Sequence, residues 1–134
     1  PLRLVIGPKD LEKNQGVLVR RDTREKVFVS LEELAPAIPA QLEALRKDLY
    51  ERALANREAR TWPATPMDEV KELAKANTGY IKTRWCGDLA CEMKMKEEAG
   101  LSSRCMPFEQ EHLSDVCPCC GKPADQMVYW GVAY

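Results

Sequence analysis

Four of the six cysteines form two close pairs, Cys86-x4-Cys91 and Cys117-x2-Cys120, with 25 residues between the pairs. Each pair is short enough for one backbone turn to direct both sulfurs at a single ion, and two such pairs supply the four thiolates of a tetrahedral structural zinc site. Gly87 and Gly121 follow the first and last of these cysteines, where tight turns allow backbone N–H groups to point at thiolates. The spacing therefore predicts one zinc ion bound by Cys86, Cys91, Cys117 and Cys120.

The remaining cysteines and the single histidine are predicted to lie outside the metal site. Cys119 is adjacent to Cys120, and neighbouring residues rarely direct both sulfurs at one tetrahedral ion without strain. Cys105 is expected to be a small buried residue of a strand, and His112 a loop residue. Free buried thiols are the main alternative to zinc, and disulfides are disfavoured because nothing in the sequence indicates an oxidising compartment. With one histidine in the chain, most acid–base catalysis is hard to arrange.

Composition limits the classes of partner. The net charge is −1 over 134 residues, so no overall basic field attracts nucleic acid, and any RNA contact must be local and specific. No run of about 18 apolar residues is present, which argues against a membrane partner. We expect a cytoplasmic protein.

The first part of the chain is predicted to position a basic hairpin. It opens on a strand at residues 2–6, which suggests a piece of a longer protein, and a short helix with proline at its start follows at 8–14. Strands at 17–21 and 26–29 are joined by a polar turn. A capping box at Ser30 and Glu33 is expected to begin a helix that Pro36 and Pro39 interrupt and that continues to about residue 60. Its predicted apolar face consists of Leu42, Leu45, Leu49 and Ala53.

The second part is predicted to fold around the cysteines. Residues 61–65 contain Pro63, precede Pro66 and show no periodicity, so they are expected to be a linker. The pattern then predicts the following elements: a helix at 65–77, a strand at 80–85, a helix at 89–98, a short strand around 104–106 and a final strand at 126–134. We therefore expect a truncated α/β domain at 1–60 and a small α+β zinc-binding domain at 66–134.

Six segments in order resemble the C-terminal portion of prolyl-tRNA synthetase, of the archaeal/eukaryote-like type. They are residues 1–12 (PLRLVIGPKDLE), 20–22 (RRD), 49–53 (LYERA), 85–88 (WCGD), 103–108 (SRCMPF) and 120–124 (CGKPA). The final Ala133-Tyr134 is also similar to the end of this family's chains. The resemblance covers essentially the whole chain.

The resemblance implies a class II synthetase that uses ATP and Mg to activate proline and transfers it to its tRNA. It implies that residues 1–60 are the last part of the anticodon-binding domain and that 66–134 are the C-terminal zinc-binding domain. Nothing in the sequence resembles the catalytic core, so this chain alone is expected to be inactive. The implied partners are the proline tRNA, the catalytic domain of the parent chain and a second copy in a homodimer.

The family also suggests which residues contact RNA. Proline anticodons are rich in guanine, whose O6 and N7 suit Arg or Lys and whose amino groups suit a carboxylate. The resemblance assigns the anticodon contacts to Arg3, Lys9, Asp10 and Lys26, although each taken by itself is more typical of a surface charge. Arg20, Arg21 and Arg24 are weaker candidates for phosphate contacts.

Two further features of the zinc domain are its last cysteine pair and its C-terminal residue. Pro118-Cys119 places a thiol between the last two ligands, where the family usually has another residue. The resemblance implies that the Tyr134 carboxylate docks near the parent active site, whereas packing of Val128, Trp130 and Val132 alone could order the same strand.

Three other classes stay open. A zinc-ribbon nucleic-acid module shares the four thiolates but is expected to be more basic. A thioredoxin-like redox site would use residues 117–120 and leave Cys86 and Cys91 unexplained. A purely structural piece without RNA contact is the third.

Overall fold

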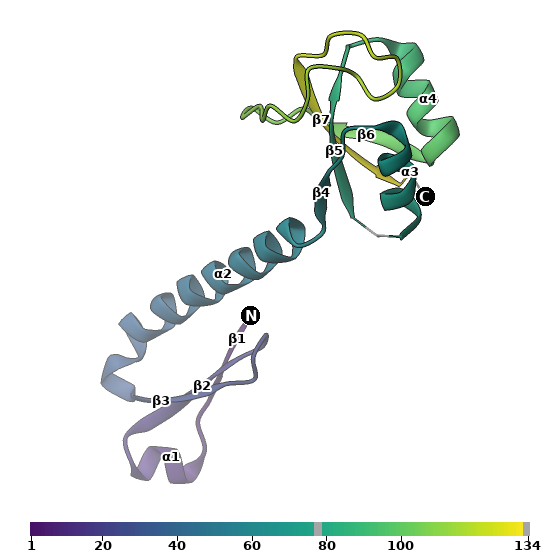
Figure 1. Ribbon diagram of the computed structural model, residues 1–134. Helices are drawn as coiled ribbons and strands as arrows, with labels where there is room; N and C mark the ends of the chain where they lie inside the picture. Colours follow the sequence, from purple (N-terminus) through teal and green to yellow (C-terminus); the bar gives the residue numbers. More distant parts are fainter. Residues whose placement is uncertain (77–78, 133–134) are drawn as a thin grey trace. The chain divides into compact units, whose positions relative to one another are not determined.

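The computed structural model describes residues 1–76 and 79–132 and contains two compact units, residues 1–55 and residues 56 onward. Both helices and sheets are present, as the predicted mixed α/β class requires (Figure 1). No helix in the described residues is both long and apolar enough to cross a membrane.

The first unit contains a three-stranded antiparallel sheet in the order β1-β2-β3. Its strands are β1 (Leu2–Val5), β2 (Gln15–Arg20) and β3 (Lys26–Ser30). The short helix α1 (Pro8–Glu12) connects β1 to β2, with proline at its first position, where the missing N–H is not needed for the helix. These elements follow the predicted order, and the polar residues between β2 and β3 form the expected turn.

Helix α2 (Leu34–Glu58) follows β3 after a 3₁₀ turn at Leu31–Glu33. The Ser30 hydroxyl accepts a hydrogen bond from the Glu32 N–H at 3.4 Å, so Ser30 caps this turn. The predicted second hydrogen bond, from Ser30 back to the Glu33 side chain, is not part of the cap. The predicted interruption at Pro36 and Pro39 is wrong. Pro36 lies in the first turn, where N–H groups have no intrahelical partner, and Pro39 lies inside a helix that continues for 25 residues in all.

One face of the β1-β2-β3 sheet lies against α2. The space beside Gly16 is filled by Leu4 and by Leu34 of α2, and Leu18 is only 1% exposed. On the helix, Leu45 is buried, but Leu42 and Leu49 of the predicted apolar face are exposed. The face turned to the sheet instead includes Asp48, which forms an ion pair with Arg20. The predicted apolar stripe is therefore only partly right, because Leu45 is buried but a half-exposed ion pair occupies part of the face that meets the sheet.

The second unit contains a four-stranded sheet in the order β4-β5-β7-β6. Its elements along the chain are β4 (Thr61–Pro63), α3 (Met67–Ala76), β5 (Tyr80–Trp85), α4 (Leu89–Ala99), β6 (Leu101–Cys105) and β7 (Gln126–Val132). Only β4 and β5 run parallel, and the pairs of β7 with β5 and β6 are antiparallel. Each predicted helix and strand of this half is therefore present, although β6 begins before the predicted 104–106 and residues 133–134 of the predicted final strand lie outside the described residues.

Strand β4 lies within the stretch that the prolines predict as a linker. Its residues pair with Tyr80, Ile81 and Lys82 of β5, and the Ala64 N–H donates to the Lys82 carbonyl at 2.9 Å. A proline is tolerated here because β4 is an edge strand and Pro63 is its last residue. The 61–65 stretch is thus partly paired into the sheet of the second unit.

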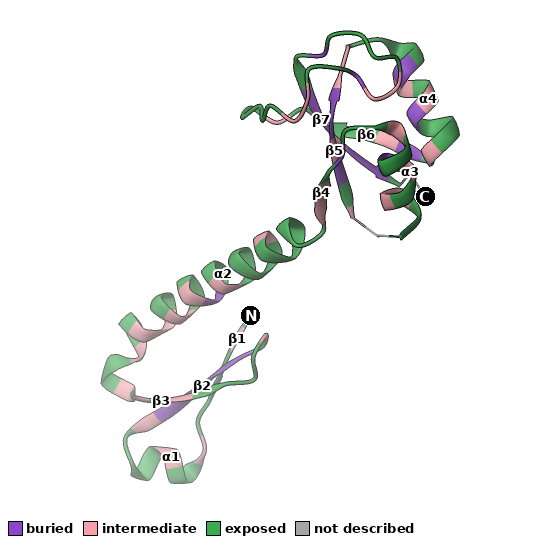
Figure 2. Ribbon diagram, viewed as in Figure 1, coloured by how far each residue is buried: buried purple, intermediate pink, exposed green. Residues whose placement is uncertain are grey.

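The core of the second unit lies between the sheet and its two helices. Buried residues are concentrated on β5 and β7 (Figure 2). Val70 of α3 and Met95 of α4 pack with side chains of the sheet, and the other buried members are Ala64, Ile81, Leu101, Val128 and Trp130. The Trp130 indole N–H donates to the Thr83 hydroxyl at 2.9 Å inside this core. The core therefore includes a fully buried polar pair.

The opposite face of this sheet is covered by the long connection between β6 and β7. Arg84 of β5 is 8% exposed and donates to the carbonyls of Glu111 and Ala124, each at 3.1 Å. Lys82 forms an ion pair with Glu111 at 2.7 Å. These contacts fix the connection that carries the second pair of cysteines.

Candidate metal centre and RNA-binding surface

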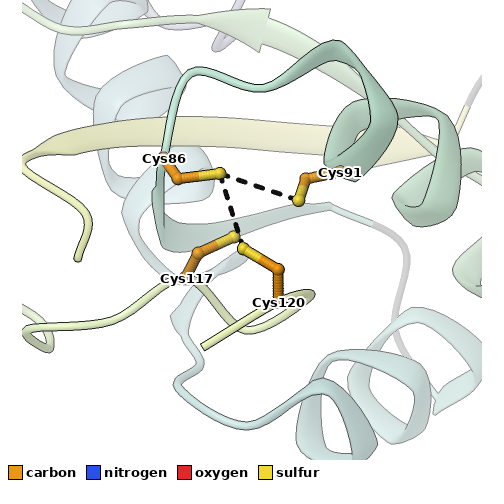
Figure 3. Close-up of side chains that lie close together, drawn as sticks. All are labelled: Cys86, Cys91, Cys117 and Cys120. Atoms are coloured by element: carbon orange, nitrogen blue, oxygen red, sulfur yellow. Dashed lines mark hydrogen bonds between the residues drawn. The ribbon is translucent and has the colours of Figure 1, made fainter. Parts of the chain in front are cut away.

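The sulfurs of Cys86, Cys91, Cys117 and Cys120 all lie within 4.8 Å of one another. Cys86 Sγ is 3.6 Å from Cys91 Sγ and 3.7 Å from Cys120 Sγ. Figure 3 shows the four side chains pointing toward a common centre. Ligands about 2.3 Å from a tetrahedral zinc lie about 3.8 Å apart, so the separations of Cys86 Sγ from Cys91 Sγ and Cys120 Sγ suit that geometry. Of the described residues, these are the ones brought together with metal-site geometry.

Two separate elements supply the first pair. Cys86 follows the end of β5, and Cys91 lies in the first turn of α4. Asp88 caps α4, because its Oδ1 accepts from the Ala90 N–H at 2.9 Å, and its carbonyl accepts from the Cys91 N–H at 3.0 Å. The start of the helix therefore fixes the position of the Cys91 side chain relative to the strand end.

A tight loop supplies the second pair. The Gly121 N–H donates to the Cys117 carbonyl and the Cys117 N–H donates to the Lys122 carbonyl, both at 2.9 Å. Gly121 has a φ of 71° and Gly87 a φ of 82°, in the left-handed region that other residues rarely adopt. The glycines predicted from the sequence thus occupy turns that need them.

The protonation of the thiols depends on their surroundings. Burial raises the pKa of Cys86 and of Cys91, because the interior disfavours the thiolate. A hydrogen bond from the Lys122 backbone N–H lowers the pKa of Cys120. Four thiolates in one place repel one another, so a cation is the natural partner of this cluster when they are deprotonated.

The three residues predicted to lie outside the metal site have different surroundings. Cys119 lies outside the four-sulfur cluster, its Sγ donates to the Cys91 carbonyl at 3.4 Å, and burial raises its pKa to about 12. His112 lies in the loop as predicted and contacts Asp115 at 2.9 Å. Cys105 is the last residue of β6, but the prediction that it is buried is wrong, because its side chain is exposed where the pairing with β7 becomes irregular.

The predicted RNA-contacting residues Arg3 and Lys26 lie in one cross-strand row. Arg3 of β1 is opposite Val19 of β2, and Val19 is opposite Lys26 of β3. Directly opposite residues of an antiparallel sheet project from the same face, so both cations lie on one face. Both are exposed, and no ion pair or side-chain hydrogen bond joins either to another described residue.

Lys9 and Asp10 lie in α1, and Asp10 also has a structural contact. Its Oδ2 accepts from the Gly7 N–H at 2.9 Å and its Oδ1 accepts from the Gln15 side chain at 3.2 Å. The Gly7 hydrogen bond is the main cause that lowers the pKa of Asp10. Lys9 is exposed. Asp10 therefore remains ionised near neutral pH and is held in a fixed orientation.

Arg20 is not available for the phosphate contact suggested by the sequence. It is 6% exposed, and its guanidinium pairs with Asp22 at 2.9 Å and with Asp48 at 2.6 Å. Arg52 also contacts Asp22, at 2.8 Å. This network was not predicted from the sequence, although Asp48 and Arg52, one helical turn apart on α2, offered a signal for it.

Arg21 and Arg24 are exposed, in contrast to Arg20. Together with Arg3 and Val19 they line a cleft of about 210 Å³ at the end of the sheet. This cleft is basic and adjoins the row that contains Arg3.

The proposed role of Tyr134 concerns a residue outside the described part of the chain.

Two family models match the chain. The model described as "Prolyl-tRNA synthetase, C-terminal" matches residues 67–134, which is just over half of the chain, and the model described as "Anticodon binding domain" matches residues 1–41. The first match contains all four clustered cysteines, and the second contains Arg3, Lys9, Asp10 and Lys26.

Curated relatives match over the full length of this chain. It is 58% identical to "Proline--tRNA ligase 2" of Bacillus cereus (strain ZK / E33L), 59% identical to "Proline--tRNA ligase" of Lachnospira eligens and 58% identical to "Proline--tRNA ligase" of Clostridium novyi. Each alignment covers all 134 residues of the chain and 28% of the relative. The chain, which spans about a quarter of the length of these relatives, belongs to the prolyl-tRNA synthetase family and contains its C-terminal domain.

Proposed function

We propose that this chain is the tRNA-reading and zinc-binding C-terminal portion of a proline–tRNA ligase of the archaeal/eukaryote-like type. The whole enzyme would use ATP and Mg to activate proline and would transfer it to the proline tRNA. The first unit would read the anticodon, and the second would be a domain stabilised by structural zinc. The chain itself would carry no catalytic residue.

The observation that carries the anticodon assignment is the row formed by Arg3, Val19 and Lys26. It places two unpaired cations of different strands on one exposed face of the sheet. Single-stranded loops offer RNA bases whose edges are accessible, and guanine presents two acceptors that suit Arg and Lys. Lys9 and the oriented carboxylate of Asp10 would complete this surface, and the basic cleft with Arg21 and Arg24 suits the backbone phosphates.

Zinc is the metal we propose for the cysteine cluster. A tetrahedral set of four thiolates is typical of structural zinc, and closed sites of this kind leave no position for substrate. Cys86, Cys91, Cys117 and Cys120 would hold the ion and fix the loops that follow β5 and precede β7. The archaeal/eukaryote-like type is supported by the resemblance of this cysteine-containing region.

Other features of the whole enzyme are proposed from the resemblance. They are a homodimeric state, a cytoplasmic location, a contact with the parent catalytic domain and a role for Tyr134 near the active site. Deletion of Tyr134 from the full-length enzyme tests the last of these, because it should slow proline activation while zinc content and melting temperature stay unchanged.

The test of the anticodon assignment uses the full-length synthetase. Arg3→Ala and Lys26→Ala should each weaken aminoacylation of the proline tRNA by about 1–3 kcal/mol per lost base contact, because a bidentate or charged contact to guanine is removed. Proline-dependent ATP–pyrophosphate exchange should be nearly unchanged. If exchange slows as much as aminoacylation, the residues support the fold rather than recognition of RNA.

A zinc-ribbon nucleic-acid module is the second candidate, and the four-thiolate cluster is the observation that favours it. It predicts that the second unit binds RNA itself. The full-length enzyme distinguishes the two, since substitutions of exposed lysines in the second unit, such as Lys122→Ala, should leave tRNA binding unchanged if the first unit reads the anticodon.

A further inference from the structure

The face of the β1-β2-β3 sheet that carries Arg3 and Lys26 continues into a second cross-strand row. Val5 of β1 is opposite Val17 of β2, and Val17 is opposite Phe28 of β3. Because side chains alternate along a strand, residues two positions apart share a face, so Phe28 lies on the same face as Lys26, about 7 Å along β3. The two rows are therefore adjacent.

The aromatic ring of Phe28 is exposed on this face. The Phe28 side chain is 63% exposed, whereas its strand neighbours Val27 and Val29 alternate with it and are half-buried on the face that packs toward α2. Val17 is 9% exposed and Val5 is 40% exposed. The exposed ring thus lies beside an apolar surface on the face that α2 does not cover.

Candidate RNA-contacting groups lie on both sides of Phe28. Arg3 and Lys26 occupy the row on one side. On the other side Gln15, which is opposite Ser30, donates its side-chain amide to Asp10. The ring is therefore placed between the two cations and the oriented carboxylate.

We infer that Phe28 is a stacking residue for an unpaired base of the RNA that Arg3 and Lys26 contact. An exposed aromatic ring offers a flat apolar surface to the face of a base, while neighbouring charged groups reach its edges and its phosphate. The inference rests on the proposed anticodon function and adds to it a residue that binds by surface complementarity rather than by charge. A base lying on the ring would be next to Lys26, which is two positions away on the same face of β3.

The pattern of this face argues for RNA rather than for a protein partner. Arg3 and Lys26 lie in the row next to the apolar part, and Asp10, held by Gln15 on the other side, is the one acidic group among the residues assigned to this face. Nucleic acid supplies both the apolar faces and the negative charge that this combination complements. A protein surface covering Phe28 would have to leave the unpaired cations beside it desolvated.

The experiment compares three substitutions of Phe28 in the full-length synthetase. Binding is measured as the Kd for an unmodified proline tRNA transcript, together with proline-dependent ATP–pyrophosphate exchange and melting temperature. Phe28→Ala and Phe28→Leu should each raise the Kd about tenfold, because stacking on the ring is lost. Phe28→Tyr keeps the ring and should bind within about twofold of the original protein.

Phe108 supplies a matched control, because it is the only other phenylalanine and is fully exposed in the second unit. Phe108→Leu makes the same chemical change at a position outside the proposed surface. It should leave the Kd unchanged. If Phe108→Leu weakens binding as much as Phe28→Leu, the effect is not specific to this face and the inference is overturned.

Arg3→Ala separates failure of the inference from failure of the proposed function. If Arg3→Ala weakens binding while Phe28→Leu does not, the stacking role is wrong and the anticodon surface stands. If neither changes the Kd, both are wrong. If Phe28→Ala lowers the melting temperature and slows ATP–pyrophosphate exchange in parallel with binding, the ring packs against protein in the whole enzyme, which also overturns the inference.

Discussion

Cys86 Sγ lies 3.7 Å from Cys120 Sγ, although the two residues are 34 positions apart in the sequence. One sulfur follows a strand of the sheet, and the other belongs to a loop that Arg84 and Lys82 hold against that sheet through residues 111 and 124. A metal ion between them would join the two parts of the second unit directly. The stability of this unit should therefore depend on the metal.

The first prediction concerns metal content. The chain should contain one zinc ion, and chelation should unfold the second unit, because the free energy of metal binding contributes directly to folding at such sites. Cys120→Ser should lose the metal. Cys119→Ser is the matched control and should keep it, since Cys119 Sγ contacts the Cys91 carbonyl instead. Elemental analysis of protein purified without chelator gives the stoichiometry, and the opposite behaviour of the two variants would contradict the ligand assignment.

The second prediction concerns the turn after Cys120. Gly121→Ala should destabilise the metal-bound form by about 1–2 kcal/mol, because an L-residue with a Cβ is strained at a φ of 71°. No atom lies within 4 Å of the position that the added methyl group would occupy, so the cost comes from the backbone and not from a clash. Gly121→Asn, which tolerates this region better, should cost less. Zinc affinity from competition with a chromogenic chelator measures the order, and equal affinities for the three proteins would show that the turn is not required.

The third prediction concerns acid sensitivity of the first unit. Hydrogen bonds from Arg20 hold the pKa of Asp22 below its ordinary value of 3.8. A carboxyl group whose pKa is lower in the folded state stabilises the fold above its unfolded pKa, and this stabilisation is lost as the pH falls through the folded value. Asp22→Asn should therefore reduce stability near pH 7, and the difference from the original protein should shrink below about pH 4.

Amide hydrogen exchange of β2 and β3 is a suitable measurement for this prediction, because the three tryptophans, Trp62, Trp85 and Trp130, all lie in the second unit. Glu43→Gln serves as a control. Its carboxylate pairs with Arg46 on the exposed surface of α2, so the effect on exchange should be small at every pH. A difference between Asp22→Asn and the original protein that stays constant from pH 7 to pH 3 would contradict the assignment.

The fourth prediction concerns the buried polar pair in the core of the second unit. Thr83→Val should lower the free energy of unfolding by about 1–3 kcal/mol, because it leaves the Trp130 indole N–H without its partner inside the core. Thr83→Ser retains the hydroxyl and should be less destabilising. Urea unfolding followed by tryptophan fluorescence compares them at saturating zinc. If the serine variant is the less stable of the two, packing of the methyl group rather than the hydrogen bond accounts for the role of Thr83.

Local patterns in the sequence were sufficient for most of the second unit. The spacing of the cysteine pairs predicted the cluster, and local sequence patterns predicted β5, α4 and β7. Short motifs also identified the prolyl-tRNA synthetase family, as the match over residues 67–134 confirms. The subtype and the roles of individual RNA-contacting residues stay predictions.

Only the tertiary structure decided which groups meet across the chain. Arg20, suggested by the sequence as a phosphate contact, instead forms an ion pair with Asp48. Cys105, expected to be buried, is exposed where the pairing of β6 with β7 is irregular. Strand β4 formed despite its proline because it joined the edge of an existing sheet. The sequence by itself determined the types of residue and the local elements, whereas strand register determined that Arg3, Lys26 and Phe28 share a face. Register depends on pairing between distant segments, and no local propensity specifies it.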